Sequence, residues 1–441
     1  MARLLNRLPT LTDPLLNEHI HAARIYGMNV FVLPKPAFQR QYAEVCVNYG
    51  SNDTTFIPHG ADASVSVPAG VAHFLEHKMF EKPWGDAFSA FASFGASANA
   101  YTTNNSTSYQ FWSLDNYDKG LDLLMEVVFA PYFTKESVEK EKSIIAQEIS
   151  MYEDQPEWRI FRETLGRLYK EHPVRLDIAG TYESIRAIDE NVLYMCHKNF
   201  YCPENATLFI AGDFEPDEML ELAQSVIEKH VDVGREPPIR IRPNEPPDVH
   251  GDVRINLPVP TPLLNIGWKD NHLLNGRDLI KREIACAFLL DVTFGKSSDF
   301  FAQVHKQGLT DDLSFSYEAW PDYAFSIVGA ESDNPNVLNE MILEEVNRVR
   351  MYGVDPAEFE RKRKAALGRF ITVFRSFESV AMSQIRLSNL GEDLFSYGSI
   401  LESLDISDID ASMDCLAQGM KVSVIVANEE GVHKKRKVMT K

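Results

Sequence analysis

Two histidines four residues apart, with a glutamate directly before the second, are the residues of this sequence best suited to chemistry. They are His73, Glu76 and His77, in the stretch VAHFLEHKMF. On a helix of about 100° per residue, the two imidazoles lie about 40° apart, and Glu76 lies about 60° from His73 on the same side. The imidazoles can therefore bind one metal ion from one face of the helix, and the carboxylate can reach a water on that ion.

Two histidines at this spacing are, by themselves, more often surface or core residues than metal ligands, so a third ligand matters. The stretch 134–158 has the pattern of a long amphipathic helix, and it carries Glu141 and Glu148, which are about two turns apart. Glu148 stands between Ile145 and Ile149, so its carboxylate lies on the apolar side, where a charge needs a partner. A solvated acidic face is the alternative for this helix.

Two imidazoles and one carboxylate are a usual ligand set of catalytic zinc, with one position left open for water. Zinc lowers the pKa of that water to about 7, and a nearby carboxylate can then accept its proton. The order H-x-x-E-H, the reverse of the common H-E-x-x-H, is a signature of zinc peptidases. These residues favour a metallopeptidase, and the ligand set favours zinc without excluding another divalent ion.

The composition indicates a soluble folded protein. The 441 residues suffice for two or three domains, and the formal net charge of −20 argues against binding to nucleic acid, whose phosphates need a basic surface. No apolar run is long enough to span a membrane. The five cysteines are odd in number and scattered, which fits reduced thiols, so we expect a cytoplasmic protein.

A proline-rich, charged stretch at 234–252 predicts a linker that divides the chain. We expect an N-terminal zinc-binding catalytic domain over 1–233. A C-terminal domain of similar fold, without metal ligands, is expected over 253–441. Its last basic segment, at 433–437, is expected to be a solvated tail.

The pattern of apolar residues, glycines and prolines predicts the elements that position the candidate residues. A helix is expected to open at Pro68 and Gly70, with the proline in its first turn, and to run to about residue 82. The other expected elements are strands at 28–36, 41–51 and 205–214, a short helix at 86–95, and paired strands at 97–114.

The two parts of the chain show a faint internal repeat. The stretch from Ala72 can be laid over the stretch from Cys286, so that Phe80 falls on Phe294 and, after a gap, Asp86 falls on Asp299. Such a repeat predicts that one fold was duplicated. In this register the residues that replace His73, Glu76 and His77 are Ala287, Leu290 and Asp291. The second copy is therefore expected to bind no metal.

These motifs together resemble the pitrilysin/insulinase family of zinc metallopeptidases. The resemblance rests on HFLEH, on EKEKSIIAQEISMYEDQP about seventy residues later, on GASANAYTTNNSTSY and on the proline-rich linker. It is strongest to the short bacterial members related to mitochondrial processing peptidase, and it covers the chain from near residue 20 to the end. It implies an α+β fold of two similar α/β-roll domains in tandem, each an antiparallel sheet with helices, forming half of a clamshell dimer.

The resemblance also implies roles for individual residues. In the family, two histidines and a glutamate of a later helix bind one zinc ion per chain, and here these are His73, His77 and Glu148. Glu76 corresponds to the general base, and Glu141 to the acid that orients a ligand histidine. The residues implied to contact the peptide substrate are Asn99 and Ala100, on an edge strand that pairs with an extended peptide, and Phe80, in the pocket just past the cut bond.

The family's oxyanion donors, an arginine and a tyrosine seven residues apart around a Gly-Leu pair, are missing here. Aligning on Gly308 places Val304 and Asp311 at those positions, and neither can donate to an oxyanion. We therefore expect a heterodimer in which a homologous subunit supplies the arginine and tyrosine. The alternative is a homodimer that uses another donor, such as Tyr317 or His305. A non-catalytic scaffold subunit is the weaker reading, because such a subunit has no reason to keep the zinc residues.

Overall fold

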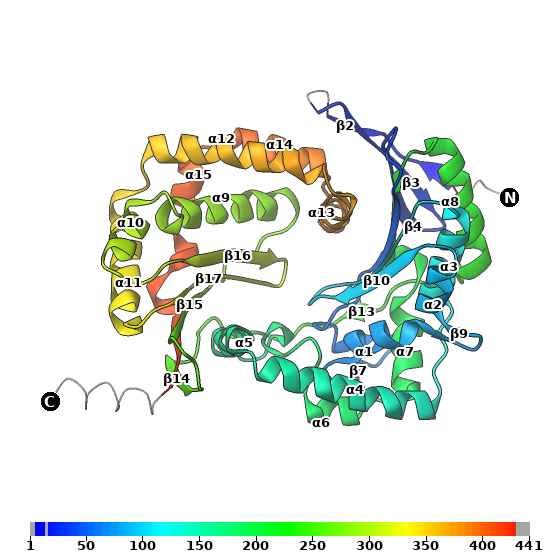
Figure 1. The fold of residues 1–441 in the computed structure, drawn as a ribbon, viewed down its shortest axis with the longest axis horizontal. Coiled ribbons are helices and arrows are strands. Elements are labelled where there is room, and N and C mark those ends of the chain that lie inside the picture. The colour runs from blue at the N-terminus through cyan, green and yellow to red at the C-terminus, as the bar shows by residue number, and fades with distance from the viewer. Residues whose placement is uncertain (1–4, 14–15, 429–441) are drawn as a thin grey trace.

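Two sheets organise the computed structural model, which describes residues 5–13 and 16–428. The first sheet has eight strands from the first half of the chain, and the second has five from the second half. Each sheet is covered by helices, so the fold is the expected pair of similar α/β units in tandem (Figure 1). The basic segment at 433–437 lies outside the described residues.

The first sheet is antiparallel except for one central pair. Its order is β1-β3-β4-β12-β5-β11-β10, with β2 paired to β3, and only β4 and β12 run parallel. Its strands are β1 (Leu5–Arg7), β2 (Leu11–Asp13), β3 (Glu18–Ile25), β4 (Met28–Pro34), β5 (Gln41–Val47), β10 (Ser97–Thr102), β11 (Thr107–Ser113) and β12 (Ala206–Gly212). The paired strands expected at 97–114 are β10 and β11, and β10 ends the sheet.

The second sheet repeats five strands of the first. Its order is β14-β18-β15-β17-β16, and only β14 and β18 run parallel, which is the arrangement of β4-β12-β5-β11-β10. Its strands are β14 (Val253–Asn256), β15 (Leu263–Lys269), β16 (Ser314–Trp320), β17 (Tyr323–Glu331) and β18 (Lys421–Ala427). The matching strand order and directions support the duplication predicted from the sequence.

The helices follow the same plan in both halves, so that α9 and α12 correspond to α1 and α4 by their order along the chain. The first half contains α1 (Val71–Met79), α2 (Ala87–Ala92), α3 (Tyr117–Phe129), α4 (Lys135–Glu153), α5 (Pro156–Leu168), α6 (Tyr182–Arg186), α7 (Glu190–Phe200) and α8 (Pro216–His230). The second contains α9 (Gly276–Phe294), α10 (Asp299–Lys306), α11 (Pro335–Tyr352), α12 (Pro356–Val373), α13 (Phe377–Asn389), α14 (Leu394–Ser403) and α15 (Ile406–Ala411).

The register expected for the repeat is wrong by one residue after its gap. Asp86 caps α2 by accepting from the backbone N–H groups of Phe88 and Ser89, and the corresponding cap of α10 is Ser298 rather than Asp299. The ring contacts support the same shift of one residue. Phe80 contacts Phe88 in the first half and Phe294 contacts Phe300 in the second, so Phe88 corresponds to Phe300.

Each half covers one face of the other half's sheet with a helix. One face of the first sheet packs on α1, α3, α7 and α8 through alternate residues such as Val45 and Phe111, and α13 packs on its other face. In return, α5 packs on β15 and β18 with the buried side chains of Ile160 and Leu165. This exchange of helices buries apolar surface between the halves. Because each Å² of buried apolar surface stabilises the folded state by about 25 cal/mol, the exchange holds the two halves together.

The predicted linker at 234–252 is tied down to both halves. It contains β13 (Ile239–Arg240), which pairs with β6 (Thr55–Ile57), itself paired with β7 (Val65–Ser66). Arg242 bridges the halves, with a nitrogen 2.9 Å from Asp53 Oδ1 and its Nε 2.5 Å from Asp322 Oδ2. We propose the same division of the chain as expected from the sequence, with 234–252 acting as a fixed strap.

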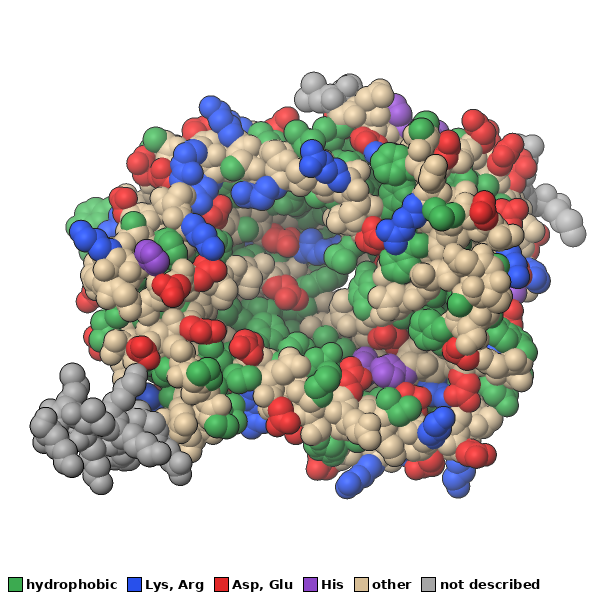
Figure 2. All heavy atoms as spheres, in the orientation of Figure 1, with side chains coloured by type: hydrophobic (Ala, Val, Ile, Leu, Met, Phe, Trp, Pro, Cys, Tyr) green, Lys and Arg blue, Asp and Glu red, His purple; other side chains and the backbone are tan. Residues whose placement is uncertain are grey.

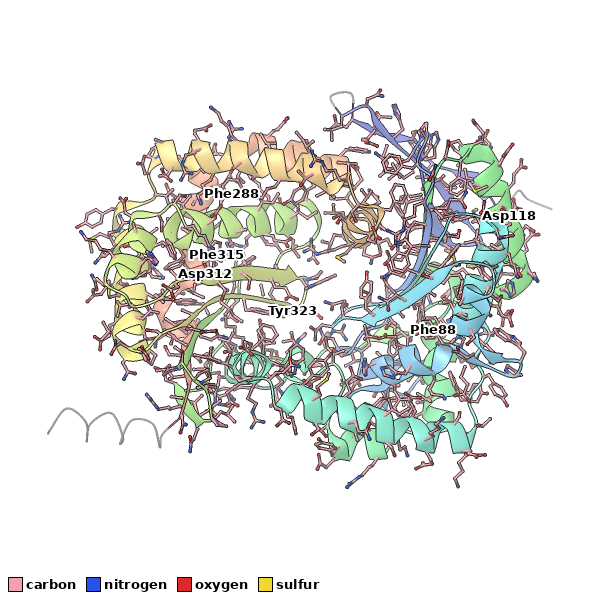
Figure 3. All side chains as sticks on the ribbon, in the orientation of Figure 1. Phe88, Asp118, Phe288, Asp312, Phe315 and Tyr323 are labelled. Carbon is pink, nitrogen blue, oxygen red and sulfur yellow. The ribbon has the colours of Figure 1, made fainter. Side chains whose placement is uncertain are left out.

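The face of the molecule in Figure 2 is hollowed between the two halves, and hydrophobic side chains gather on the floor of the hollow. Tyr323, at the start of β17, lies on the side of the second half that faces the first (Figure 3). Its hydroxyl accepts a hydrogen bond of 2.9 Å from Nδ2 of Asn105, a residue of the turn between β10 and β11. The end of the edge strand is therefore held by the second half of the same chain.

Candidate metal centre

Helix α1 positions the two histidines and the glutamate of the HFLEH motif. Val71, Phe74 and Leu75 are buried in the core of the first half, which leaves the stripe of His73, Glu76 and His77 on the opposite side. The helix ends at Met79 rather than at residue 82, and Pro68 precedes it instead of lying in its first turn. A single turn of helix thus carries both imidazoles, whose ring centroids are 4.5 Å apart.

The N-terminus of α1 depends on a glycine. Gly70 caps the helix with φ of +92°, a left-handed conformation that side chains rarely adopt. A Cβ at this position would lie 2.6 Å from the backbone oxygen of Ala179. The close approach of this loop and the left-handed cap together fix where α1 begins.

Helix α4 positions the two glutamates. Thr134 and Ser137 form a capping box at its start, and Val138, Ile145 and Ile149 anchor it in the core. The helix stops at Glu153, before the expected end at 158, and Pro156 opens the next helix, α5. Glu141 and Glu148 lie along the side of α4 that faces α1.

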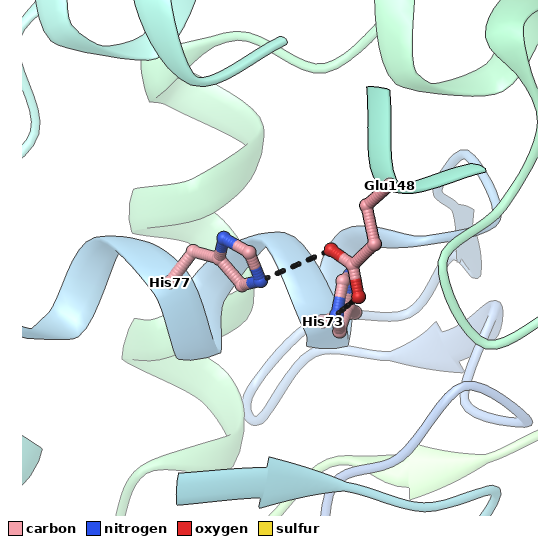
Figure 4. A group of neighbouring side chains, drawn as sticks. All are labelled: His73, His77 and Glu148. Carbon is pink, nitrogen blue, oxygen red and sulfur yellow. Dashed lines mark ion pairs between the residues drawn. The ribbon is translucent and has the colours of Figure 1, made fainter. Parts of the chain in front are cut away.

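The three expected metal ligands converge (Figure 4). His73 Nε2 lies 3.6 Å from Glu148 Oε1, and His77 Nε2 lies 3.5 Å from Glu148 Oε2. One potential ligand atom from each of the three residues lies within 4.8 Å of the others. Ligand bonds of about 2.1 Å in a tetrahedron place ligand atoms about 3.4 Å apart, so these separations suit a zinc-sized ion between the three side chains.

Glu141 orients one of the two imidazoles. Its Oε1 lies 3.0 Å from His77 Nδ1, which leaves Nε2 of that ring facing Glu148. Burial lowers the pKa of His77, but the hydrogen bond and charge of Glu141, together with the charges of Glu76 and Glu148, outweigh it, and the pKa is raised overall. Burial raises the pKa of Glu141, but His77 and the charges of nearby lysines outweigh it, so that pKa is lowered overall. A carboxylate behind a ligand histidine is the usual support of a zinc site.

The remaining donor atoms are consistent with a cation at this place. The approach of His73 lowers the pKa of Glu148 against burial, which raises it, so the carboxylate form is favoured. His73 is 9% exposed, and its Nε2 is the ring nitrogen that faces the carboxylate of Glu148, at 3.6 Å. The donor set of two imidazoles and a carboxylate therefore fits zinc in its chemistry and its spacing.

Glu76 lies beside this group but outside it. Its Oε2 accepts a hydrogen bond of 2.6 Å from the hydroxyl of Thr102, at the end of β10. Asn99 and Ala100 lie on the same strand, which within the described residues has β11 as its one strand neighbour. The sequence interpretation missed Thr102, although its place two residues beyond Ala100 puts both side chains on one face of a strand.

The residue expected to line a pocket is deeply buried. Phe80 is 4% exposed, and its ring stacks on that of Phe88 with centroids 4.0 Å apart. Phe88 is 44% exposed and is labelled on α2 in Figure 3. The surface next to α1 is therefore formed by Phe88, with Phe80 beneath it.

The residues at the positions of the missing oxyanion donors cannot serve as donors. Val304 is fully buried in the core of the second half, and Asp311 is an exposed carboxylate. Of the two substitutes considered, Tyr317 donates its hydroxyl to Asp270 Oδ2 at 2.8 Å in the interior. His305 lies on α10, which is on the far side of the molecule from α1 (Figure 1).

The second half carries an ion pair where the first carries the candidate metal ligands. Asp291, which takes the place of His77, receives Lys362 Nζ from α12 at 2.6 Å. Arg369, seven residues further along α12, lies 3.7 Å from the same carboxylate. Lys362 and Arg369 thus repeat the seven-residue spacing of the two glutamates of α4, with opposite charge.

Two other buried histidines have structural roles. His197 is buried, its Nε2 lies 3.0 Å from the backbone oxygen of Val128, and burial lowers its pKa to about 3. His172 caps a short turn by accepting from the N–H of Val174. Neither belongs to a metal group within the described part of the chain.

Comparisons with known proteins agree with this fold. Residues 56–182 match the family described as Insulinase (Peptidase family M16), and residues 187–366 match Peptidase M16 inactive domain. The protein named Uncharacterized zinc protease YmfH, from Bacillus subtilis, is 37% identical over 88% of this chain and 91% of its own length. Two imidazoles from one helix and a carboxylate from another are a donor set that is usual in catalytic zinc sites. The chain belongs to peptidase family M16, the pitrilysin/insulinase family.

Solved structures of the family share the whole architecture. An M16-like peptidase from Alicyclobacillus acidocaldarius superimposes with a TM-score of 0.88 and 35% identity, over 96% of this chain and 100% of that one. Pitrilysin superimposes with a TM-score of 0.74 and 15% identity, over 96% of this chain and 46% of its own, which shows the shared fold. Within residues 5–13 and 16–428, no helix is both long and apolar enough to cross a membrane.

Proposed function

We propose that this chain is a zinc-dependent endopeptidase that cleaves short or unfolded peptides, such as leader segments of precursors. The observation that carries the proposal is the convergence of His73, His77 and Glu148, with Glu76 on the same turn of helix. The name zinc protease, given to relatives such as YmfH, supports both the metal and the reaction.

Each polar side chain of the centre has a task in this proposal. His73, His77 and Glu148 hold one zinc ion, and Glu141 keeps the His77 ring in place through Nδ1. Zinc, when bound, supplies Lewis acidity and lowers the pKa of a water to about 7. Glu76 accepts a proton from the attacking water and returns it to the departing amine.

The substrate is proposed to lie along β10. A peptide in extended conformation can pair with the backbone of an edge strand, which reads main chain more than side chains. Asn99 and Ala100 are the proposed pairing residues, and the proposed side-chain contact past the cut bond is formed by Phe88 over Phe80. We propose that the peptide reaches this strand through the hollow between the halves that Figure 2 shows.

The oxyanion donors are proposed to come from a second, homologous subunit. Val304 and Asp311 stand where an arginine and a tyrosine are needed, and the hydroxyl of Tyr317 is already bound to Asp270. A heterodimer in which the partner carries the Arg/Tyr pair supplies both donors at once. All five cysteines are free and buried, which supports a reducing, cytoplasmic location for the pair.

The test is cleavage of an internally quenched fluorescent peptide by the zinc-loaded chain, alone and mixed with an Arg/Tyr-bearing homologue. We expect turnover in the mixture and none by the chain alone. We expect Glu76→Gln to lower the turnover of the mixture at least 100-fold while zinc stays bound. Turnover by the chain alone would contradict the heterodimer hypothesis and favour the homodimer. No cleavage in either case, with zinc bound, would refute the peptidase proposal.

A further inference from the structure

We propose that Thr102 is a positioning residue for the general base, so that the strand proposed to bind the substrate also holds the carboxylate that activates water. The inference rests on the proposed function of Glu76. Thr102 is the last residue of β10, and its Oγ1 lies 2.6 Å from Glu76 Oε2 on α1. This is a direct contact between the edge strand and the helix that carries the metal ligands.

The hydroxyl protons of Thr102 and Thr107 determine which atom donates in the hydrogen bond between Thr102 and Glu76. Thr102 lies opposite Thr107 in the β10–β11 ladder, with the two Oγ1 atoms 3.3 Å apart. Thr107 donates its own proton to the backbone oxygen of Tyr49 at 2.8 Å. A hydroxyl has one proton, and a carboxylate only accepts, so the proton of Thr102 goes to Glu76.

This hydrogen bond fixes one oxygen of the base and leaves the other available. Oε2 of Glu76 is occupied by Thr102, while Oε1 has no hydrogen-bond partner within the described residues. A carboxylate held by one oxygen loses the freedom to rotate about its last bond, and the free oxygen then keeps one direction. A hydrogen bond to a charged group is also stronger than one between neutral groups.

Strand geometry explains why this residue can couple substrate and base. Side chains alternate along β10, so Ala98, Ala100 and Thr102 share one face, and the two alanines pack on the core that contains α1. Tyr101 points to the other face, where its hydroxyl donates to Glu44 Oε1 at 3.0 Å. The backbone of the same strand provides the edge for an extended peptide. A peptide that orders this strand therefore also orders the residue that holds Glu76.

The test compares Thr102→Val, which keeps the shape and removes the hydroxyl, with Thr102→Ser, which keeps the hydroxyl. In the zinc-loaded, active assembly we expect Thr102→Val to lower kcat about 10- to 100-fold with KM changed less than about twofold. We expect Thr102→Ser to keep at least a third of kcat. The matched control is Thr103→Val. It removes the neighbouring hydroxyl, which accepts from the N–H groups of Asn105 and Ser106 in the turn between β10 and β11.

A second measurement uses the metal-free chain and does not depend on activity. A double-mutant cycle of Thr102→Val and Glu76→Met, followed by urea unfolding, isolates the coupling between the two side chains. We expect Thr102→Val to lower the unfolding midpoint less in the Glu76→Met background than in the wild type. Zinc content should be unchanged in Thr102→Val, because no metal ligand is altered.

The outcomes separate this inference from the proposed function. Equal losses of kcat in the valine and serine variants, or a kcat of Thr102→Val within twofold of wild type, would overturn the positioning role. Additive midpoint shifts in the cycle would overturn the contact itself. An inactive wild type with a non-additive cycle would instead refute the peptidase proposal and leave the Thr102–Glu76 contact standing.

Discussion

Lys362 Nζ lies 2.6 Å from Asp291 Oδ1, in the place where Glu141 contacts His77 in the first half. Both contacts join corresponding helices, α12 to α9 and α4 to α1. Seven residues further along, Arg369 approaches Asp291 as Glu148 approaches His77. One duplicated arrangement of helices therefore holds a metal-type ligand group in the first half and an ion pair in the second.

This ion pair is expected to stabilise the second half. Replacing Lys362 with methionine keeps the apolar stem but leaves the largely buried carboxylate of Asp291 without its nearest partner. We expect Lys362→Met to lower the free energy of unfolding by about 1–3 kcal/mol, measured by urea denaturation. The control is Arg361→Met on the exposed side of the same helix, for which the change should stay within about 0.5 kcal/mol. Equal effects of the two changes would contradict the role of the pair.

Glu141 is expected to matter for zinc affinity without touching the ion. Removing it with Glu141→Ala leaves His77 Nδ1 without its partner, so the ring is free to turn away from Glu148. We expect zinc to bind about 10- to 100-fold more weakly, measured by competition with a chromophoric chelator. Glu139→Ala, on an exposed side of the same helix, is the matched control and should bind zinc as the wild type does. An unchanged affinity in Glu141→Ala would show that the carboxylate has no part in the centre.

The strap between the halves is expected to make stability depend on pH. Burial raises the pKa of Asp322, but the close approach of His172 and the charge and hydrogen bond of Arg242 outweigh it and lower the pKa to about 2. Because the pKa is lower in the folded state, this carboxylate stabilises the protein above its ordinary pKa of 3.8. That contribution is lost as the pH falls through about 2.

We therefore expect Asp322→Asn to lower the free energy of unfolding by about 2 kcal/mol above pH 5, with the difference from wild type shrinking below pH 4. The measurement is urea unfolding of both proteins at a series of pH values. A difference that stays constant down to pH 2 would show that the charge of this residue does not tie the strap to the second half.

The N-terminal cap of α1 is expected to tolerate no side chain. Gly70 has φ of +92° and a backbone oxygen 2.6 Å from the place of a Cβ, whereas Gly95 has φ of +80° and nothing within 4 Å. We expect Gly95→Ala to cost about 1 kcal/mol for the backbone conformation alone. Gly70→Ala should cost clearly more and should also weaken zinc binding, because α1 has to move. Thermal unfolding and zinc titration of the two variants test this, and equal costs would contradict it.

Much of the site could be predicted from the sequence because its ligands follow helical spacing. His73 and His77 share a face by periodicity, and Glu148 shares a stripe with Glu141, so each pair could be placed on its helix. The approach of α4 to α1 could not be derived from spacing, since it depends on how both helices pack on the sheet. The resemblance to the family supplied that step.

Other contacts left no local signal. Thr102 is 26 residues from Glu76, on a strand, and a single hydroxyl has no periodicity. From the sequence, Lys362 and Arg369 are ordinary charged residues of a surface helix. Only the structure shows that both contact Asp291. The proline-rich stretch was expected to be a plain linker, and only tertiary structure pairs its residues with β6 and binds Arg242 to both halves.

The most direct test of this account is the zinc stoichiometry of the purified chain and of Glu148→Gln, measured by elemental analysis and by titration of the metal-free proteins. We predict one tightly bound zinc per wild-type chain and at least 100-fold weaker binding by Glu148→Gln, because the carboxylate is one of three ligands. Glu76→Gln should bind zinc as the wild type does. A wild-type chain without stoichiometric zinc, or a Glu148→Gln variant that binds it equally well, would contradict the assignment of this centre.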